Sequence, residues 1–133
     1  MIERLLCAAS ALTALFGTAY AADIKPVTPI AHHVCMVLDA PDDVMMDTQH
    51  PISLMAAPNP SASVISDASV VMAVDTTQPP QNGYALSMTY TLKPGWVSTK
   101  WLKPYSAVHP GVTCSPYVMS NGKLGFNFQH HSR

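Results

Sequence analysis

The chain has 133 residues, of which only 11% are charged, and its 7 basic and 8 acidic residues nearly cancel. Such sparse and balanced charge makes a weak electrostatic footprint and argues against a nucleic-acid partner. The length is that of one domain with a modest core, which gains from a covalent crosslink.

The first residues have the organisation of a secretory signal peptide. Arg4 supplies the positive charge, Leu5 to Phe16 is an apolar run, and Ala19 and Ala21 are small residues suited to cleavage. The apolar run is well short of the roughly 20 residues that cross a bilayer. We therefore predict that residues 1–21 are a signal peptide and that the mature protein is periplasmic or secreted from a bacterium, without a membrane span. A retained N-terminal anchor is the alternative.

Two cysteines follow the predicted cleavage site, Cys35 and Cys114. An even count in an oxidising compartment favours a disulfide, and two thiols allow only one intramolecular pairing. In the chain-entropy description such a bridge stabilises by about 4–5 kcal/mol. A metal site and an intermolecular bridge are the competing interpretations.

Residues 22–50 predict an extended arm with one short strand and a turn. The arm contains Pro26 and Pro29 and shows no apolar period, whereas His33 to Leu38 is an apolar run suited to a buried strand. A turn is expected next, followed by a single helical turn over Asp43 to Gln49 with Asp42 or Asp43 as its cap.

Residues 51–105 alternate between short apolar segments and turn signals. Strands are expected at Ile52 to Leu54, Val64 to Ile65 and Val70 to Val74, and a loop at residues 78–83. Every second residue from Tyr84 to Tyr90 is large and apolar or aromatic, which is the period of a strand with one buried face.

The next predicted turn is at Pro94 and Gly95, and Trp96 to Ser98 is the returning strand. Residues 106–133 predict a second hairpin, with strands at Tyr117 to Ser120 and Lys123 to Phe128. Asn121 and Gly122 between them favour a type I′ turn. We expect this hairpin to pack on a small barrel formed by residues 51–105.

The same segment resembles the bacterial SH3-like domain family. The resemblance covers about residues 51–105, and Gly95-Trp96-Val97 after a turn is its most specific element. Further matching segments are Ile52-Ser53-Leu54, Pro58, Val64-Ile65, Val70 to Val74, Asn82-Gly83-Tyr84 and Leu102. The resemblance implies a small SH3-like barrel with a binding or spacing role in the cell envelope. We therefore expect an all-β protein in which this barrel carries N- and C-terminal strand extensions and one disulfide that are not general features of the family. Met55 stands where the family often has an arginine.

Cations and aromatic rings alternate near the end of this segment. Such a surface stacks on prolines or sugars while its lysines meet carboxylate or phosphate. The resemblance implies an envelope peptide, protein or peptidoglycan as partner, without a cofactor. The alternative is that Trp96 fills the barrel and Trp101 seals its end. The candidate ligand-binding residues are Tyr84, Trp96, Lys100, Trp101, Lys103 and Tyr105.

A periplasmic copper- or zinc-handling protein is the second functional hypothesis. It would use His32, His33, Met45, Met46 and, if unbridged, Cys35, whose side chains suit these metals. Neighbouring histidines on an extended chain point to opposite sides, so a site built on that pair is disfavoured. The third functional hypothesis is a small secreted inhibitor or structural subunit, in which the hairpin at Asn121-Gly122 would be the interaction edge. No serine lies in a Gly-x-Ser-x-Gly setting, and we expect no enzymatic activity.

Overall fold

The computed structural model describes residues 23–131, which are predominantly strand. The predicted signal peptide, residues 1–21, lies outside the described residues. No helix among residues 23–131 is long and apolar enough to cross a membrane. The elements are β1 (Pro26–Pro29), β2 (His33–Leu38), α1 (Asp42–Met45), β3 (Ser53–Met55), β4 (Val64–Asp67), β5 (Val71–Asp75), β6 (Tyr84–Met88), β7 (Pro94–Ser98), the 3-10 turn η1 (Thr99–Trp101), β8 (Leu102–Pro104), α2 (Tyr105–Val108), β9 (Val112–Met119) and β10 (Leu124–His130).

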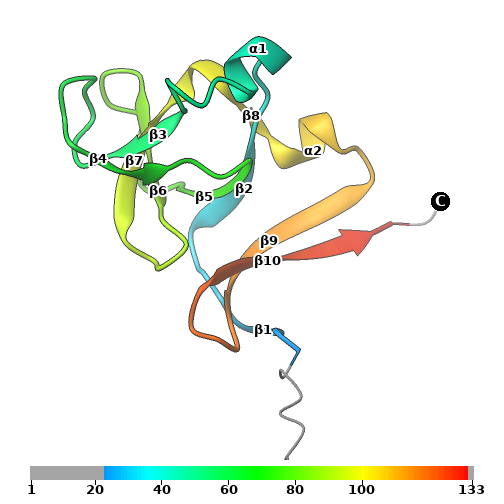
Figure 1. Ribbon diagram of the computed structural model, residues 1–133. Helices are drawn as coiled ribbons and strands as arrows, with labels where there is room; N and C mark the ends of the chain where they lie inside the picture. Colours follow the sequence, from blue (N-terminus) through cyan, green and yellow to red (C-terminus); the bar gives the residue numbers. More distant parts are fainter. Residues whose placement is uncertain (1–22, 132–133) are drawn as a thin grey trace, which may run out of the picture.

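The strands pair in three antiparallel sheets, with the orders β1-β9-β10, β5-β2-β8 and β4-β3-β7-β6 (Figure 1). The prediction of a mainly β protein is confirmed, and β2 has the predicted limits. The three sheets do not close into a barrel. Strands β5 and β6 lie in different sheets, and no backbone ladder joins them among the described residues. A side-chain bond from the Ser87 hydroxyl to the Ala73 carbonyl, 2.7 Å long, bridges these two strands.

The core lies between the second and third sheets. Its buried members are Leu38, Leu54, Met72, Val74, Ala85 and Val97, with Trp101 and Leu102 among the partly buried residues that pack against them. Completely burying a side chain of this size stabilises the fold by about 1.5–3 kcal/mol. Leu38 of β2 belongs to this core, and Leu102 of β8, the strand paired with β2, packs against it. Neither strand is part of the β6–β7 hairpin, which carries Gly95-Trp96-Val97.

The buried face of β6 is the opposite of the predicted one. Ala85 and Ser87 are buried, whereas Tyr84, Leu86 and Met88 are half-buried on the other face and Tyr90 is exposed. On this inner face the Ser87 hydroxyl donates to the Ala73 carbonyl of β5. The prediction that the large residues form the buried face is therefore wrong, although the alternation itself is confirmed.

Two turns also differ from their predictions. The turn between β6 and β7 is residues 89–93, closed by the Thr89 N–H donating to the Lys93 carbonyl at 2.7 Å. Pro94 and Gly95 instead begin β7. Four residues, 120–123, lie between β9 and β10. The Met119 N–H donates to the Lys123 carbonyl at 2.8 Å, and of these four residues Gly122 has the positive φ, 77°. The predicted two-residue type I′ turn is thus absent there.

A tight turn with two positive φ values occurs at Asn82 and Gly83, whose φ angles are 51° and 78°. These are the values of a type I′ turn, and the backbone groups of Gln81 and Tyr84 bond to each other across it. The one-turn helix α1 spans Asp42–Met45, and Pro41 precedes it without a side-chain capping bond. The predicted aspartate cap is therefore wrong, and the helix begins and ends earlier than expected.

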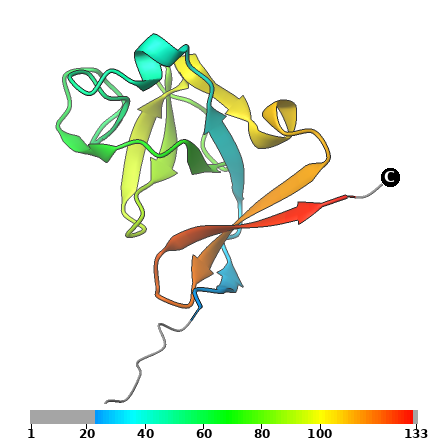
Figure 2. The same cartoon turned by 45° about the vertical axis from the view of Figure 1, so that its right-hand side comes forward.

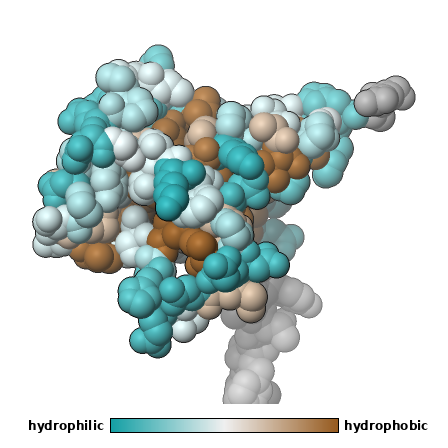
Figure 3. All heavy atoms as spheres, turned by 90° about the horizontal axis from the view of Figure 1, so that it is seen from above, coloured by the Kyte–Doolittle hydropathy of each residue, from teal (hydrophilic) through white to brown (hydrophobic). Residues whose placement is uncertain are grey.

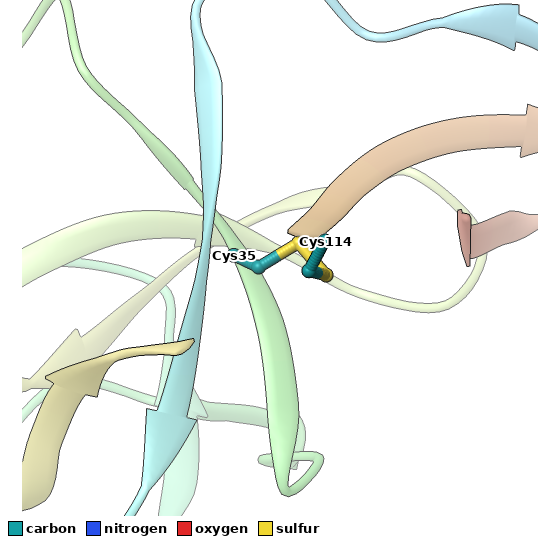
Figure 4. The surroundings of a disulfide bond; sticks show 2 residues. All are labelled: Cys35 and Cys114. Carbon is teal, nitrogen blue, oxygen red and sulfur yellow. A yellow bond between two sulfur atoms is a disulfide. The ribbon is translucent and has the colours of Figure 1, made fainter. Parts of the chain in front are cut away.

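The predicted disulfide is confirmed. Cys35 on β2 is bonded to Cys114 on β9, and Figure 4 shows the bridge where the two strands come together. In the first sheet, β9 and β10 extend away from the other two sheets, and the C-terminus of the chain lies beyond the end of β10 (Figure 2). A second contact near the other end of the hairpin is the Leu124 N–H, which donates to the Tyr90 carbonyl at 2.9 Å.

Candidate functional site

A groove on the outer face of the third sheet holds two of the predicted aromatic residues. The groove, called the Trp101 groove below, has a volume of about 400 Å³. Strands β3, β4, β6 and β7 supply half of its walls, and α1, the segment before β3 and η1 supply the rest. Its lining residues are Val44, His50, Pro51, Ile52, Ser53, Met55, Val64, Tyr84, Ser98 and Trp101.

Trp101 is held at the end of the groove by the backbone around it. The Asp39 N–H donates to the Trp101 carbonyl at 2.8 Å, and the Ser98 hydroxyl accepts from the Lys100 N–H at 3.3 Å to start η1. The indole also packs against the core, so it is half-buried. One residue therefore both packs on the core and forms a wall of the groove.

The strand register places Tyr84 and Trp96 on the same outer face. Tyr84 is opposite Ser98, and Trp96 is opposite Leu86 on one side and Met55 on the other. Val97, which points the other way, has an exposed fraction of 0%, whereas Trp96 is half-buried. Trp96 thus faces away from the core, next to Met55 of the groove rather than among its lining residues.

The lining is electrically neutral apart from its histidine. None of the described residues that line the groove is Asp, Glu, Lys or Arg. His50 lies 3.2 Å from the Asp47 carboxylate. The backbone N–H of Gln49 and, to a lesser extent, the groups of His50 bond to that carboxylate and hold the pKa of Asp47 below its ordinary value.

The two predicted lysines behave differently. Lys100 places its Nζ 4.9 Å from the centre of the Trp101 ring, in a cation–π contact at the edge of the groove. Lys103 is paired with the Asp39 carboxylate at 2.5 Å. Both members of that pair are substantially exposed, so the pair contributes little to stability. Of these two lysines, Lys100 is the one beside the aromatic groove.

Tyr105 belongs to a different cavity. It lies on α2, where its ring is 5.3 Å from that of Phe128 and 4.6 Å from that of His109. It lines a cleft of about 610 Å³ beside the disulfide, between β2 and β9. The six predicted residues therefore do not form one surface: Tyr84 and Trp101 share the groove, Lys100 and Trp96 border it, Lys103 is ion-paired, and Tyr105 is in the disulfide cleft.

The groove also uses residues that the sequence did not single out as binding residues. These are chiefly His50, Pro51, Met55 and Val64. Met55 stands where the resemblance predicts an arginine, and this difference was the available signal that the wall is apolar. Val64 is 60% exposed on β4, at the edge of the sheet. In the view of Figure 3, apolar residues form separate patches among hydrophilic ones rather than one continuous surface.

The residues proposed for copper or zinc are dispersed. Cys35 is bonded to Cys114 and so offers no thiolate. His32 and His33 lie at the start of β2, whereas Met45 and Met46 lie at the end of α1. Within residues 23–131, no three His, Cys, Asp or Glu side chains are grouped so that they could hold an ion.

Comparisons of the chain with protein families, with curated protein sequences and with solved structures find no match, so a functional assignment depends on the residues and their geometry.

Proposed function

We propose that the chain is an exported, non-catalytic binding module whose Trp101 groove receives an extended, mainly apolar peptide of the cell envelope. The observation that carries the proposal is that Tyr84 and Trp101, from different elements, form walls of one neutral groove. Aromatic grooves of this kind recognise extended peptides, because a preformed extended chain loses little entropy when it packs between flat rings.

The neutral lining favours a peptide over peptidoglycan. Glycan strands present many hydroxyl groups, and burying them requires matching polar partners. The side-chain polar groups of the lining are those of Ser53, Ser98 and His50, the Tyr84 hydroxyl and the Trp101 indole N–H. The apolar residues are Val44, Pro51, Ile52, Met55 and Val64. Lys100 at the edge suits a carboxylate of the ligand just outside the groove.

An SH3-like ancestry of residues 51–105 is part of this proposal. It is supported by the two hairpins β3–β4 and β6–β7 and by the pairing of β3 with β7 in one sheet. Within Gly95-Trp96-Val97, the first and third residues are buried and the tryptophan is on the outer face. The predicted export and the disulfide are compatible with an envelope location.

The test is a selection of random peptides on the purified mature protein, with intact peptidoglycan sacculi as the competing probe. Enriched peptides should be apolar and should bind measurably in isothermal titration. Peptide binding should be weakened more than tenfold by Val64→Asp, which puts a carboxylate into the neutral groove. Capture by sacculi without enrichment of any peptide would overturn the choice of ligand.

Two control variants make the test specific for the groove. Val70→Asp introduces the same charge at a residue that is 55% exposed, close to the 60% of Val64, but outside the groove lining. Tyr105→Ala removes an aromatic ring from the disulfide cleft. We expect both controls to bind like the wild type, and equal loss in Val64→Asp and Val70→Asp would place the ligand elsewhere.

A further inference from the structure

The edge strands of the sheets differ in how well they are protected from pairing with another chain. Exposed edges are normally blunted by prolines, charged residues, bulges or short length. Strand β1 contains Pro26 and Pro29, and β8 has three residues, including Lys103 and Pro104. Strand β4 ends in Asp67, and its pairing with β3 contains a register shift.

Strand β10 has none of these protections. It is seven residues long, Leu124–His130, with the sequence LGFNFQH, and contains neither proline nor an Asp, Glu, Lys or Arg. It pairs with β9 along its whole length in a continuous register. Both ribbon views show it running away from the other two sheets toward the C-terminus (Figures 1 and 2).

The hydrogen-bonding register decides which backbone groups of β10 face outward. The Met119 N–H donates to the Lys123 carbonyl, so odd-numbered residues of β10 bond to β9. The backbone groups of Phe126, Phe128 and His130 therefore point away from β9. The start of the edge is covered, since the Leu124 N–H donates to the Tyr90 carbonyl. Among residues 23–131, no strand pairs with the outer side of β10.

We propose that this edge pairs with the β10 edge of a second copy of the chain. The three outward-facing residues are evenly spaced about Phe128, so an antiparallel, twofold-symmetric pairing centred there matches every outward N–H with a carbonyl. Phe128 would face its own counterpart, and Phe126 of each copy would face His130 of the other. These positions share one face, and aromatic cross-strand pairs of this kind are favourable.

The charge distribution favours an identical partner. Twofold pairing brings the same residues of two copies together, so any formal charge on the edge would repel itself. The uncharged edge avoids this repulsion, and Phe128, which is 43% exposed, loses solvent contact in the pairing. The resulting sheet would have the order β1-β9-β10-β10-β9-β1. Because only a short edge is joined, the dimer belongs to the weak, concentration-dependent class.

The test is sedimentation velocity of the purified mature protein over a roughly hundredfold concentration range, with amide hydrogen exchange at both ends of the range. We expect the mean mass to rise toward that of two chains. We also expect the amides of Phe126, Phe128 and His130 to become protected as it rises. A protein that stays monomeric across the whole range would overturn the proposal. This outcome would also be the one expected if a different protein, rather than a second copy, paired with this edge.

Two variants address the edge directly. Gln129→Lys places a charge beside the twofold axis, and Phe128→Pro removes an outward N–H without touching the β9 ladder. Each variant should raise the dissociation constant of the dimer at least tenfold. If the proline variant does not fold, Gln129→Lys alone tests whether the β10 edge is the interface. The control is Thr28→Lys on β1, the opposite edge of the same sheet.

A dimer that survives Gln129→Lys would mean that another surface is used. The groove variant Val64→Asp should dimerise like the wild type, so this proposal and the peptide-binding proposal can fail independently.

Discussion

Cys35 and Cys114 join the middle strands of two different sheets, β2 of the second sheet and β9 of the first. Their Cα atoms are 6.0 Å apart, and 79 positions separate them in the sequence. The bridge therefore anchors the first sheet, with its exposed β10 edge, to the part of the molecule that contains the core and the Trp101 groove.

Removing this bridge should be strongly destabilising. The chain-entropy description gives a loss of about 4–5 kcal/mol for the double variant Cys35→Ser, Cys114→Ser, because the unfolded chain regains the freedom of a long loop. Urea unfolding of the variant and of the oxidised wild type measures the loss. Reductant should bring the wild type to the stability of the variant and leave the variant unchanged. Equal midpoints for oxidised wild type and variant would contradict the prediction.

Gly95 should not tolerate a side chain, because of the space around it. A Cβ at this position would lie 3.0 Å from the Leu54 Cβ, and Leu54 is only 2% exposed. Overpacking of this kind costs about 1–3 kcal/mol, which we expect for Gly95→Ala in denaturant unfolding. Combining Gly95→Ala with Leu54→Gly, which removes the Leu54 Cβ, should cost less than the sum of the two single changes. Strict additivity would show that the two residues do not compete for space.

Gly122 should resist substitution for a different reason. Its φ is 77°, and an added Cβ would meet no atom within 4 Å, so the cost of Gly122→Ala comes from the backbone alone. The left-handed conformation costs an alanine about 1–2 kcal/mol. Asparagine adopts it more readily, so Gly122→Asn should retain more stability in thermal unfolding. If alanine and asparagine were equally costly, backbone conformation would not be the cause.

Acid should weaken the junction between β5 and the following loop. The Asp75 carboxylate accepts bonds from the Thr77 hydroxyl at 2.6 Å and from the Thr77 N–H at 2.7 Å. These bonds, aided by the nearby His33 and His32, hold the pKa of Asp75 below its ordinary value of 3.8. A carboxyl with a lowered pKa stabilises the fold above its ordinary pKa, and the stabilisation is lost as the pH falls through the lowered value.

The corresponding measurement is the free energy of unfolding as a function of pH. We expect it to decline below a pH of about 3.8, the ordinary pKa of the group, and to decline less steeply in Asp75→Asn, which keeps an oxygen acceptor but cannot titrate. Asp23→Asn, at the exposed start of the described chain, is the matched control for the loss of one charge. Identical pH profiles for wild type and Asp75→Asn would rule out this role of the Thr77 bonds.

Much of the local structure was readable in the sequence because it depends on neighbouring residues. The apolar run His33 to Leu38 predicted β2 at its exact limits. With two cysteines after the predicted cleavage site, the bridge had one possible intramolecular pairing, and that pairing is present. Turns were less predictable: two Asn-Gly pairs occur, but only Asn82-Gly83 has the two positive φ values.

The candidate site was readable only in part. Tyr84 and Trp101 were selected with a group of aromatic residues and lysines, and they do share a groove. Tyr105 was selected on the same grounds but follows β8 into α2, which directs it to the disulfide cleft. Val64 and Pro51 could not be identified, because their role comes from the packing of β4 and of the segment before β3 beside Tyr84.

The sequence alone predicted which segments alternate as strands and allowed the two cysteines one intramolecular pairing, since these depend on local conformational preference and on composition. The tertiary structure decided which side of each alternation is buried. A period of two is the same for both faces of β6, and packing against β5, where the Ser87 hydroxyl bonds to the Ala73 carbonyl, accompanies the burial of the small residues. Tyr84 therefore lies on the outer face of the third sheet, where it forms one wall of the groove.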